Sequence, residues 1–166
     1  ASSAAAANRL LFSSLGLVGP KLHAMVGDGV EGQSPGDPEA VARAYAGTLV
    51  AALGPEPVFD LALIGVGEDG HVASLFPGRA AAAERSGLVL VERDSPKPPS
   101  TRLTLSLPLL AASRSVVVAA FGAGKADIVR TVLHDHGSQL PAARLLRLAP
   151  DTRVFLDPAA ASALPK

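Results

Sequence analysis

Two side chains suited to acid–base chemistry stand close together in a glycine-rich segment. Residues 65–71 read GVGEDGH, so Asp69 precedes His71 by two positions. An imidazole can act as a base near neutral pH, and a neighbouring carboxylate can orient it or stabilise its protonated form. A structural interpretation is equally simple: Asp69 caps the following helix and His71 fills a polar pocket. The spacing alone does not choose between these two interpretations.

The three glycines of this segment allow backbone angles that other residues avoid. They would let main-chain N–H groups around Gly67 and Gly70 come close to a ligand. Gly65, Gly67 and Gly70 also match the pattern G-x-G-x-x-G literally. We reject a dinucleotide site, because no helical pattern follows cleanly and no acidic residue ends a following strand.

An apolar run leads into the glycine-rich segment. Residues 58–66 (VFDLALIGV) predict a strand covered on both faces, as in parallel sheets. Because ligands of open α/β sheets bind at the carboxyl ends of strands, we expect residues 65–71 at the functional edge. We expect further helices at 8–17, at 39–53 after the Asp37-Pro38 cap, at 126–133 and from Pro158. Further strands are expected at 21–26, 102–107, 115–121, 144–148 and 154–156, with a loop at 27–38. This alternation indicates an α/β fold with a largely parallel sheet and flanking helices.

Composition excludes several classes of function. The chain has 166 residues, which fits a single domain over 1–166, and its formal net charge of +0 lacks the basic excess of nucleic-acid binders. It has no cysteine, which excludes thiol nucleophiles and zinc–thiolate sites. No apolar run reaches the roughly 20 residues that span a bilayer. We therefore expect no nucleic-acid or membrane partner and a cytoplasmic location, with an organelle such as a plastid left open.

Residues 61–78, LALIGVGEDGHVASLFPG, resemble the signature of 6-phosphogluconolactonases. Matching blocks follow in the same order: DSPKPP at 94–99, RLTL at 102–105, GAGKA at 122–126, LPAA at 140–143 and FLD at 155–157. Glucosamine-6-phosphate deaminases share the fold and the Asp-Gly-His core. They continue towards Asn-Glu-Pro-Gly, where this chain has SLFPG, so the lactonase branch is the better match.

The resemblance implies a function and roles for individual residues. The family hydrolyses 6-phosphoglucono-δ-lactone to 6-phosphogluconate in the oxidative pentose phosphate pathway, with no metal or organic cofactor. His71 would be the general base that activates water, and Asp69 would position its imidazole. Backbone N–H groups around Gly67 and Gly70 would stabilise the oxyanion.

Two cations are candidates for binding the substrate phosphate. Lys125 follows Gly122-Ala123-Gly124 at a helix start, where amides and a flexible loop favour an anion. The segment is not a Walker A motif, because Ala126 follows the lysine. Arg102 opens an alternating strand and could fork onto phosphate or carboxylate. The alternatives are a solvated lysine at a helix start and a surface arginine on a strand.

One part of the family pattern does not occur in this sequence. The Gly-Gly-Ser/Thr phosphate loop and the Asp-Glu-Arg segment are missing before Asn8. We therefore expect the chain to be N-terminally incomplete and to need a missing segment or a protein partner that covers the sheet edge. The alternative function is a catalytically inactive lactonase-like subunit that serves as a structural module in a larger assembly.

Overall fold

The computed structural model describes residues 23, 25 and 37–165. The helix expected at 8–17 and nearly all of the segment expected at 21–36 lie outside the described residues. The elements in chain order are α2 (Pro38–Leu53), β1 (Leu61–Gly65), α3 (Ala80–Ala83), β2 (Val89–Glu92), β3 (Arg102–Leu105), α4 (Leu107–Ala111), β4 (Ser115–Ala120), η2 (Ala123–Lys125), α5 (Ala126–His134), α6 (Pro141–Leu148) and β5 (Thr152–Leu156). Among these elements, no helix is long and apolar enough to cross a membrane.

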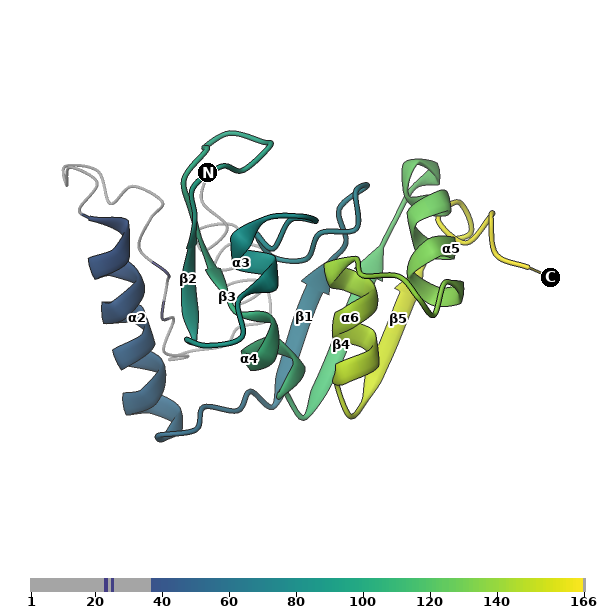
Figure 1. Ribbon diagram of the computed structural model, residues 1–166. Coiled ribbons are helices and arrows are strands. Elements are labelled where there is room, and N and C mark those ends of the chain that lie inside the picture. The colour runs from purple at the N-terminus through teal and green to yellow at the C-terminus, as the bar shows by residue number, and fades with distance from the viewer. Residues whose placement is uncertain (1–22, 24, 26–36, 166) are drawn as a thin grey trace, which may run out of the picture.

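The main sheet has three parallel strands in the order β1-β4-β5 (Figure 1). Leu63 lies opposite Val117, which in turn lies opposite Arg153. All three strands therefore end at the same edge, and the loops that follow them meet there. The expected α/β fold with its parallel sheet and flanking helices is confirmed.

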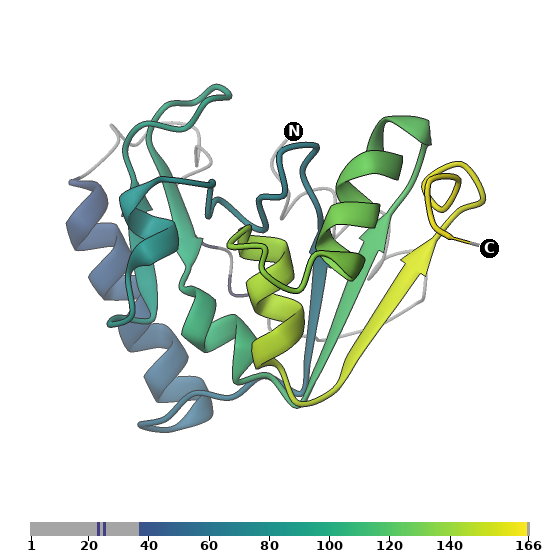
Figure 2. The same cartoon turned by 45° about the vertical axis from the view of Figure 1, so that its right-hand side comes forward.

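Helices α4, α5 and α6 lie on one face of this sheet (Figure 2). The core between the helices and the sheet contains Val116 and Val118 from β4, with Leu107 from α4, Val132 from α5 and Leu145 from α6. All five side chains are buried. This packing fixes the positions of the loops at the carboxyl edge.

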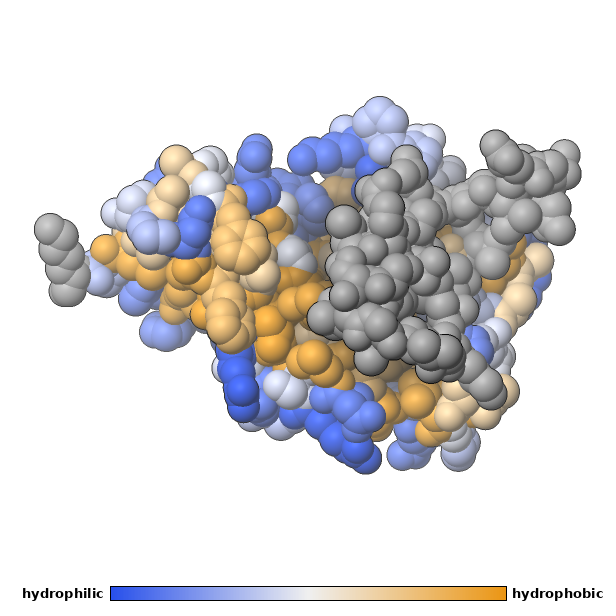
Figure 3. All heavy atoms as spheres, turned by 180° about the vertical axis from the view of Figure 1, so that it is seen from behind, coloured by the Kyte–Doolittle hydropathy of each residue, from blue (hydrophilic) through white to orange (hydrophobic). Residues whose placement is uncertain are grey.

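The opposite face of the sheet carries exposed apolar side chains. Leu61 is 56% exposed, Leu63 68% and Phe155 54%. Figure 3 looks at this side of the molecule and shows apolar side chains gathered there. The expectation that the first strand is covered on both faces is therefore wrong for the described residues. The apolar run 58–66 suggested burial on both faces, whereas within β1 (Leu61–Gly65) only Ala62 is buried.

A second, antiparallel sheet is formed by the hairpin β2–β3, against which α2 packs. Sequence reasoning predicts β3 but not β2. Helix α2 confirms its predicted bounds closely. Asp37 accepts a hydrogen bond from the backbone N–H of Glu39, and the helix ends before Gly54.

Residues 144–148 are helical, so the strand expected there is wrong. They belong to α6, which Pro141 opens, and the buried residues Ala142 and Leu145 face the core from one side of the helix. The run RLLRL at 144–148 is too short to establish a period, and the proline-initiated helix prevails. The terminal helix expected from Pro158 is also wrong, because residues 158–163 form turns. The short helices α3 and α4 are further additions.

Candidate active site

The loop that follows β1 is a closed turn held by its own backbone. The N–H of Gly67 donates to the carbonyl of His71 at 2.9 Å, and the N–H of Gly70 donates to the carbonyl of Gly67 at 2.9 Å. Val66 and Val72 pair as an antiparallel bridge where the chain enters and leaves the turn. The segment 65–71 therefore presents the side chains of residues 68, 69 and 71 at the carboxyl edge of the sheet, as predicted.

Asp69 and His71 are in direct contact. The Nδ1 atom of His71 lies 2.5 Å from Oδ1 of Asp69, and the backbone N–H of His71 donates to the same oxygen at 3.2 Å. The imidazole is mostly enclosed, with 16% of the side chain exposed, whereas the Asp69 side chain is 43% exposed. Because Nδ1 is engaged by the carboxylate, Nε2 is the ring nitrogen left for a ligand.

The environment of Asp69 favours its ionised form. Partial burial raises the pKa of this carboxyl, but hydrogen bonds from the His71 ring and backbone N–H, with the charge of the imidazolium, outweigh it. The pKa of Asp69 therefore lies below its ordinary value. An ionised Asp69 can hold the neutral imidazole in one tautomer and stabilise the imidazolium. The structure does not form the helix cap considered for Asp69.

Gly67 is placed where no larger residue fits. A Cβ atom there would overlap Nδ1 and Cε1 of His71. Its backbone therefore lies against the Nδ1–Cε1 edge of the imidazole and holds the ring from that side. The N–H groups of Gly67 and Gly70 themselves donate within the loop, so oxyanion stabilisation by N–H groups around these glycines stays a prediction.

Gly70 connects the loop to α6. Its φ of +82° lies in the left-handed region that favours glycine, and a Cβ there would come within 2.9 Å of the Leu140 side chain. The carbonyl of Gly70 accepts a hydrogen bond from the N–H of Ala142 in the first turn of α6, at 3.0 Å. Helix α6 thus fixes the backbone directly before His71.

Lys125 lies on the neighbouring loop, which follows β4. The carboxylate of Asp157, just after β5, accepts hydrogen bonds from the N–H of Gly122 at 3.0 and 3.1 Å. A Cβ at Gly124 would lie 3.6 Å from Oε1 of Glu68, so this loop runs beside the His71 loop. All three parallel strands therefore contribute a loop to one site.

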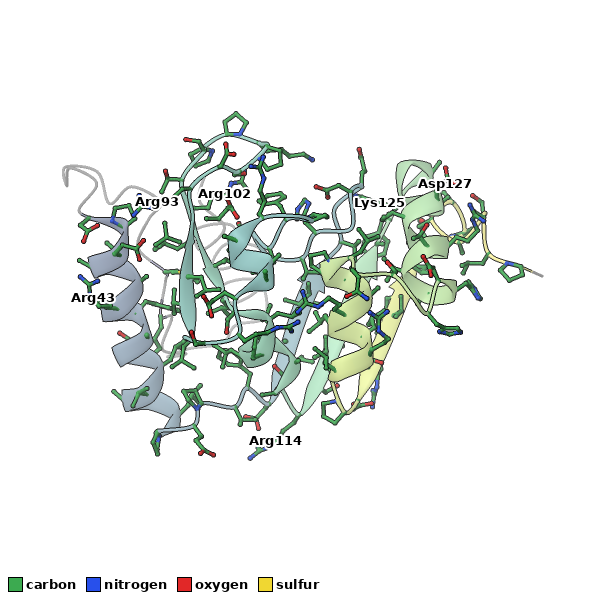
Figure 4. The ribbon with its side chains drawn as sticks, in the orientation of Figure 1. Arg43, Arg93, Arg102, Arg114, Lys125 and Asp127 are labelled. Carbon is green, nitrogen blue, oxygen red and sulfur yellow. The ribbon has the colours of Figure 1, made fainter. Side chains whose placement is uncertain are left out.

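Arg102 does not lie beside Lys125. Figure 4 shows the two cations on separate elements, Arg102 at the start of β3 and Lys125 before α5. The guanidinium of Arg102 donates to the carbonyls of Lys97, Pro98 and Pro99. The structure thus joins Asp69, Gly67, Gly70 and His71 in one loop and gives Arg102 backbone partners.

Sequence reasoning missed two residues that shape the site. The Phe76 ring lies 4.5 Å from the His71 ring, centroid to centroid, and is 1% exposed. Asp157 anchors the Lys125 loop. Phe76 belongs to the SLFPG block and Asp157 to the FLD block. The family resemblance therefore included both residues but assigned neither of them a role. Among residues 37–165, no three side chains of metal-ligating type gather closely enough to hold an ion.

Comparison with known proteins finds 6-phosphogluconolactonases among the relatives of this chain. A sequence profile described as glucosamine-6-phosphate isomerases/6-phosphogluconolactonase matches residues 1–154. The 6-phosphogluconolactonase of Streptomyces coelicolor is 42% identical over 166 residues, covering 96% of this chain and 62% of that protein. That of Rattus norvegicus is 49% identical over 108 residues, covering 65% of this chain and 42% of that protein. The chain spans about half the length of the curated relatives it matches.

Solved structures give the same picture. The 6-phosphogluconolactonase of Trypanosoma brucei has 35% identity and a TM-score of 0.69, covering 80% of this chain and 56% of that chain. That of Leishmania guyanensis has 35% identity and a TM-score of 0.68, covering 77% and 53%. A monomeric glucosamine-6-phosphate deaminase has 29% identity and a TM-score of 0.61, covering 77% and 56%. Sequence and fold therefore agree with the resemblance seen in the motifs.

Proposed function

The chain belongs to the family of glucosamine-6-phosphate isomerases and 6-phosphogluconolactonases, and we propose that it hydrolyses 6-phosphoglucono-δ-lactone to 6-phosphogluconate. The observation that carries the proposal is the contact between His71 and Asp69 on the loop after β1. The lactonase names of the relatives support this choice of reaction. The reaction is a step of the oxidative pentose phosphate pathway. We propose it for the whole protein, residues 1–166 forming part of a single domain.

The chemistry follows from the free nitrogen of His71. Its Nδ1 faces Asp69, so Nε2 accepts a proton from water while the water oxygen attacks the lactone carbonyl carbon. The ring C–O bond then breaks, and the imidazolium returns its proton to the departing ring oxygen. The carboxylic acid so formed loses its own proton to solvent. Ionised Asp69 stabilises the imidazolium throughout, and a positioned base contributes about 10²–10⁴-fold.

Lys125 supplies a positive charge for the substrate phosphate. It ends η2, immediately before the first turn of α5, and is half-buried beside the His71 loop. An ammonium at this position attracts a phosphate as a point charge. Gly67 and Gly70 serve the site by shape, since the first admits the imidazole and the second allows the tight turn.

Location and protein contacts are part of the same proposal. We propose a cytoplasmic protein whose partner in the reaction is a small sugar-phosphate lactone. The exposed apolar residues Leu61, Leu63 and Phe155 support a covering polypeptide over this side of the sheet, either a further segment or a protein partner.

The experiment is hydrolysis of freshly generated 6-phosphogluconolactone by the full-length protein, measured against the spontaneous rate. The matched variant is His71→Asn, which keeps a polar side chain of similar size but has no basic nitrogen. We expect the wild type to exceed the spontaneous rate and the variant to lose about 10²–10⁴-fold. A wild-type rate equal to buffer, or an unchanged variant, overturns the proposal.

A further inference from the structure

The imidazole of His71 is held on more than one side. Asp69 binds Nδ1, and the Gly67 backbone lies against the Nδ1–Cε1 edge. The Phe76 ring packs on the imidazole at a centroid distance of 4.5 Å and an angle of 45° between the planes. Because Phe76 is 1% exposed, it is itself fixed by the core. The orientation of the His71 ring therefore depends on the position of Phe76.

Arg102 also contacts the Phe76 ring. Its Cζ atom is 5.8 Å from the centroid of the Phe76 ring, so the guanidinium lies over the ring as a cation–π partner. Contacts therefore run in series from Arg102 through Phe76 to His71. The Phe76 ring is thus a shared neighbour of Arg102 and His71.

The donors of Arg102 are committed to the backbone. Nε donates to the carbonyl of Pro99 at 3.2 Å, and Nη2 donates to the carbonyls of Lys97 at 2.9 Å and Pro98 at 2.8 Å. These three hydrogen bonds hold residues 97–99, in the loop that connects β2 to β3, against the first residue of β3. A guanidinium that binds three carbonyls through one edge keeps only Nη1 for any other acceptor.

We propose that Arg102 and Phe76 are positioning residues for His71 and that Arg102 is not a phosphate ligand. Arg102 fixes the 97–99 loop and the Phe76 ring, and Phe76 fixes the imidazole. The proposal deepens the lactonase function above and rests on it for the role of His71. The contacts themselves stand without it.

Kinetics with two substrates separate positioning from phosphate binding. Arg102→Met should lower kcat about 10-fold on 6-phosphogluconolactone and by the same factor on an unphosphorylated glucono-δ-lactone, with KM changed less than about 2-fold. Lys125→Ala is the control and should raise KM for the phosphorylated lactone alone. A rise in KM confined to the phosphorylated substrate in Arg102→Met overturns the proposal.

Replacing Arg102 by lysine gives opposite expected results for a phosphate ligand and for a positioning residue. A phosphate ligand needs the charge, so Arg102→Lys would restore most of the activity lost in Arg102→Met. A positioning residue needs the planar fork that reaches three carbonyls, so Arg102→Lys should remain close to Arg102→Met. Recovery to within about 2-fold of the wild type contradicts the positioning role.

A spectroscopic measurement tests the ring contacts without any catalysis. Phe76 lies close enough to shift the ring-proton NMR signals of His71, which are assigned by their loss in His71→Asn. Phe76→Leu, which keeps most of the side-chain volume, should remove that shift, and Arg102→Met should change it while the thermal unfolding curve stays cooperative. Unchanged His71 signals in both variants overturn the proposal. If the wild type hydrolyses no lactone but these signals move, the function fails and the positioning stands.

Discussion

The Oδ1 atom of Asp69 accepts hydrogen bonds from both the ring and the backbone of His71, at 2.5 and 3.2 Å. One carboxylate oxygen thus fixes the imidazole and the turn that carries it. Asp69→Asn keeps an acceptor oxygen but removes the charge that stabilises the imidazolium. We expect kcat for lactone hydrolysis to fall about 10- to 100-fold with little change in KM. Asp69→Ala, which also frees the ring, should lose more, and equal losses in the two variants would contradict a role for the charge.

The same carboxylate makes stability depend on pH. The pKa of Asp69 in the folded protein lies below its ordinary value of 3.8, so its stabilising effect is complete above that value. The effect disappears as pH falls through the lowered folded-state pKa, where both states bind the proton. Because the side chain is 43% exposed, we expect less than about 1 kcal/mol. Urea unfolding should show wild type above Asp69→Asn at pH 7, with the gap closing below pH 3.8. A gap independent of pH would contradict this origin.

A methyl group at Gly67 should inactivate the protein without unfolding it. The added Cβ overlaps Nδ1 and Cε1 of His71, so the imidazole must leave its place against Asp69. We expect Gly67→Ala to lower kcat/KM at least about 100-fold, comparable to displacing a general base. Gly65→Ala is the matched control, because a Cβ there meets nothing within 4 Å. Similar activities for the two variants would show that the ring tolerates displacement.

The strands of the main sheet are predictable from sequence because their signal is local. Apolar runs locate β1, β4 and β5, and the Asp37-Pro38 cap locates the start of α2. Residues 144–148 mislead because five residues are too few to establish a period, and the burial of Ala142 and Leu145 against the core shows the helix. The apolar character of β1 likewise does not reveal that Leu63 is exposed.

The site is predictable only in part, for a related reason. Asp69 and His71 are two positions apart, so their contact follows from local spacing. Phe76 meets Arg102 across 26 positions, and Asp157 meets Gly122 across 35, so these contacts exist only once the sheets have formed. The phosphate role expected for Arg102 from its charge stays a prediction, and the structure adds that its Nε and Nη2 atoms donate to carbonyls 97–99.

Asp157 should affect substrate binding through the Lys125 loop. Its two carboxylate oxygens accept from the N–H of Gly122, and one of them also accepts from Ala160 at 2.8 Å. Asp157→Ala releases the start of the loop, so Lys125 loses its fixed place. We expect KM for the phosphorylated lactone to rise about 3- to 10-fold with a smaller effect on kcat. The control is Asp151→Ala, which removes an exposed carboxylate just before β5. An equal rise in KM in this variant would contradict a specific role of Asp157 in anchoring the Lys125 loop.

Gly70 should be costly to replace for two separable reasons. Its φ of +82° strains any residue with a Cβ by about 1–2 kcal/mol, and that Cβ would also press on Leu140 and Ile128. Gly78 has a φ of +73° with nothing within 4 Å, so Gly78→Ala measures the backbone strain alone. We expect urea unfolding to show a larger loss of stability for Gly70→Ala than for Gly78→Ala. Adding Leu140→Ala should recover part of the excess in a double-mutant cycle, because it removes the nearest side chain. Equal losses at the two glycines, or additive effects of the pair, would mean that α6 does not press on the loop before His71.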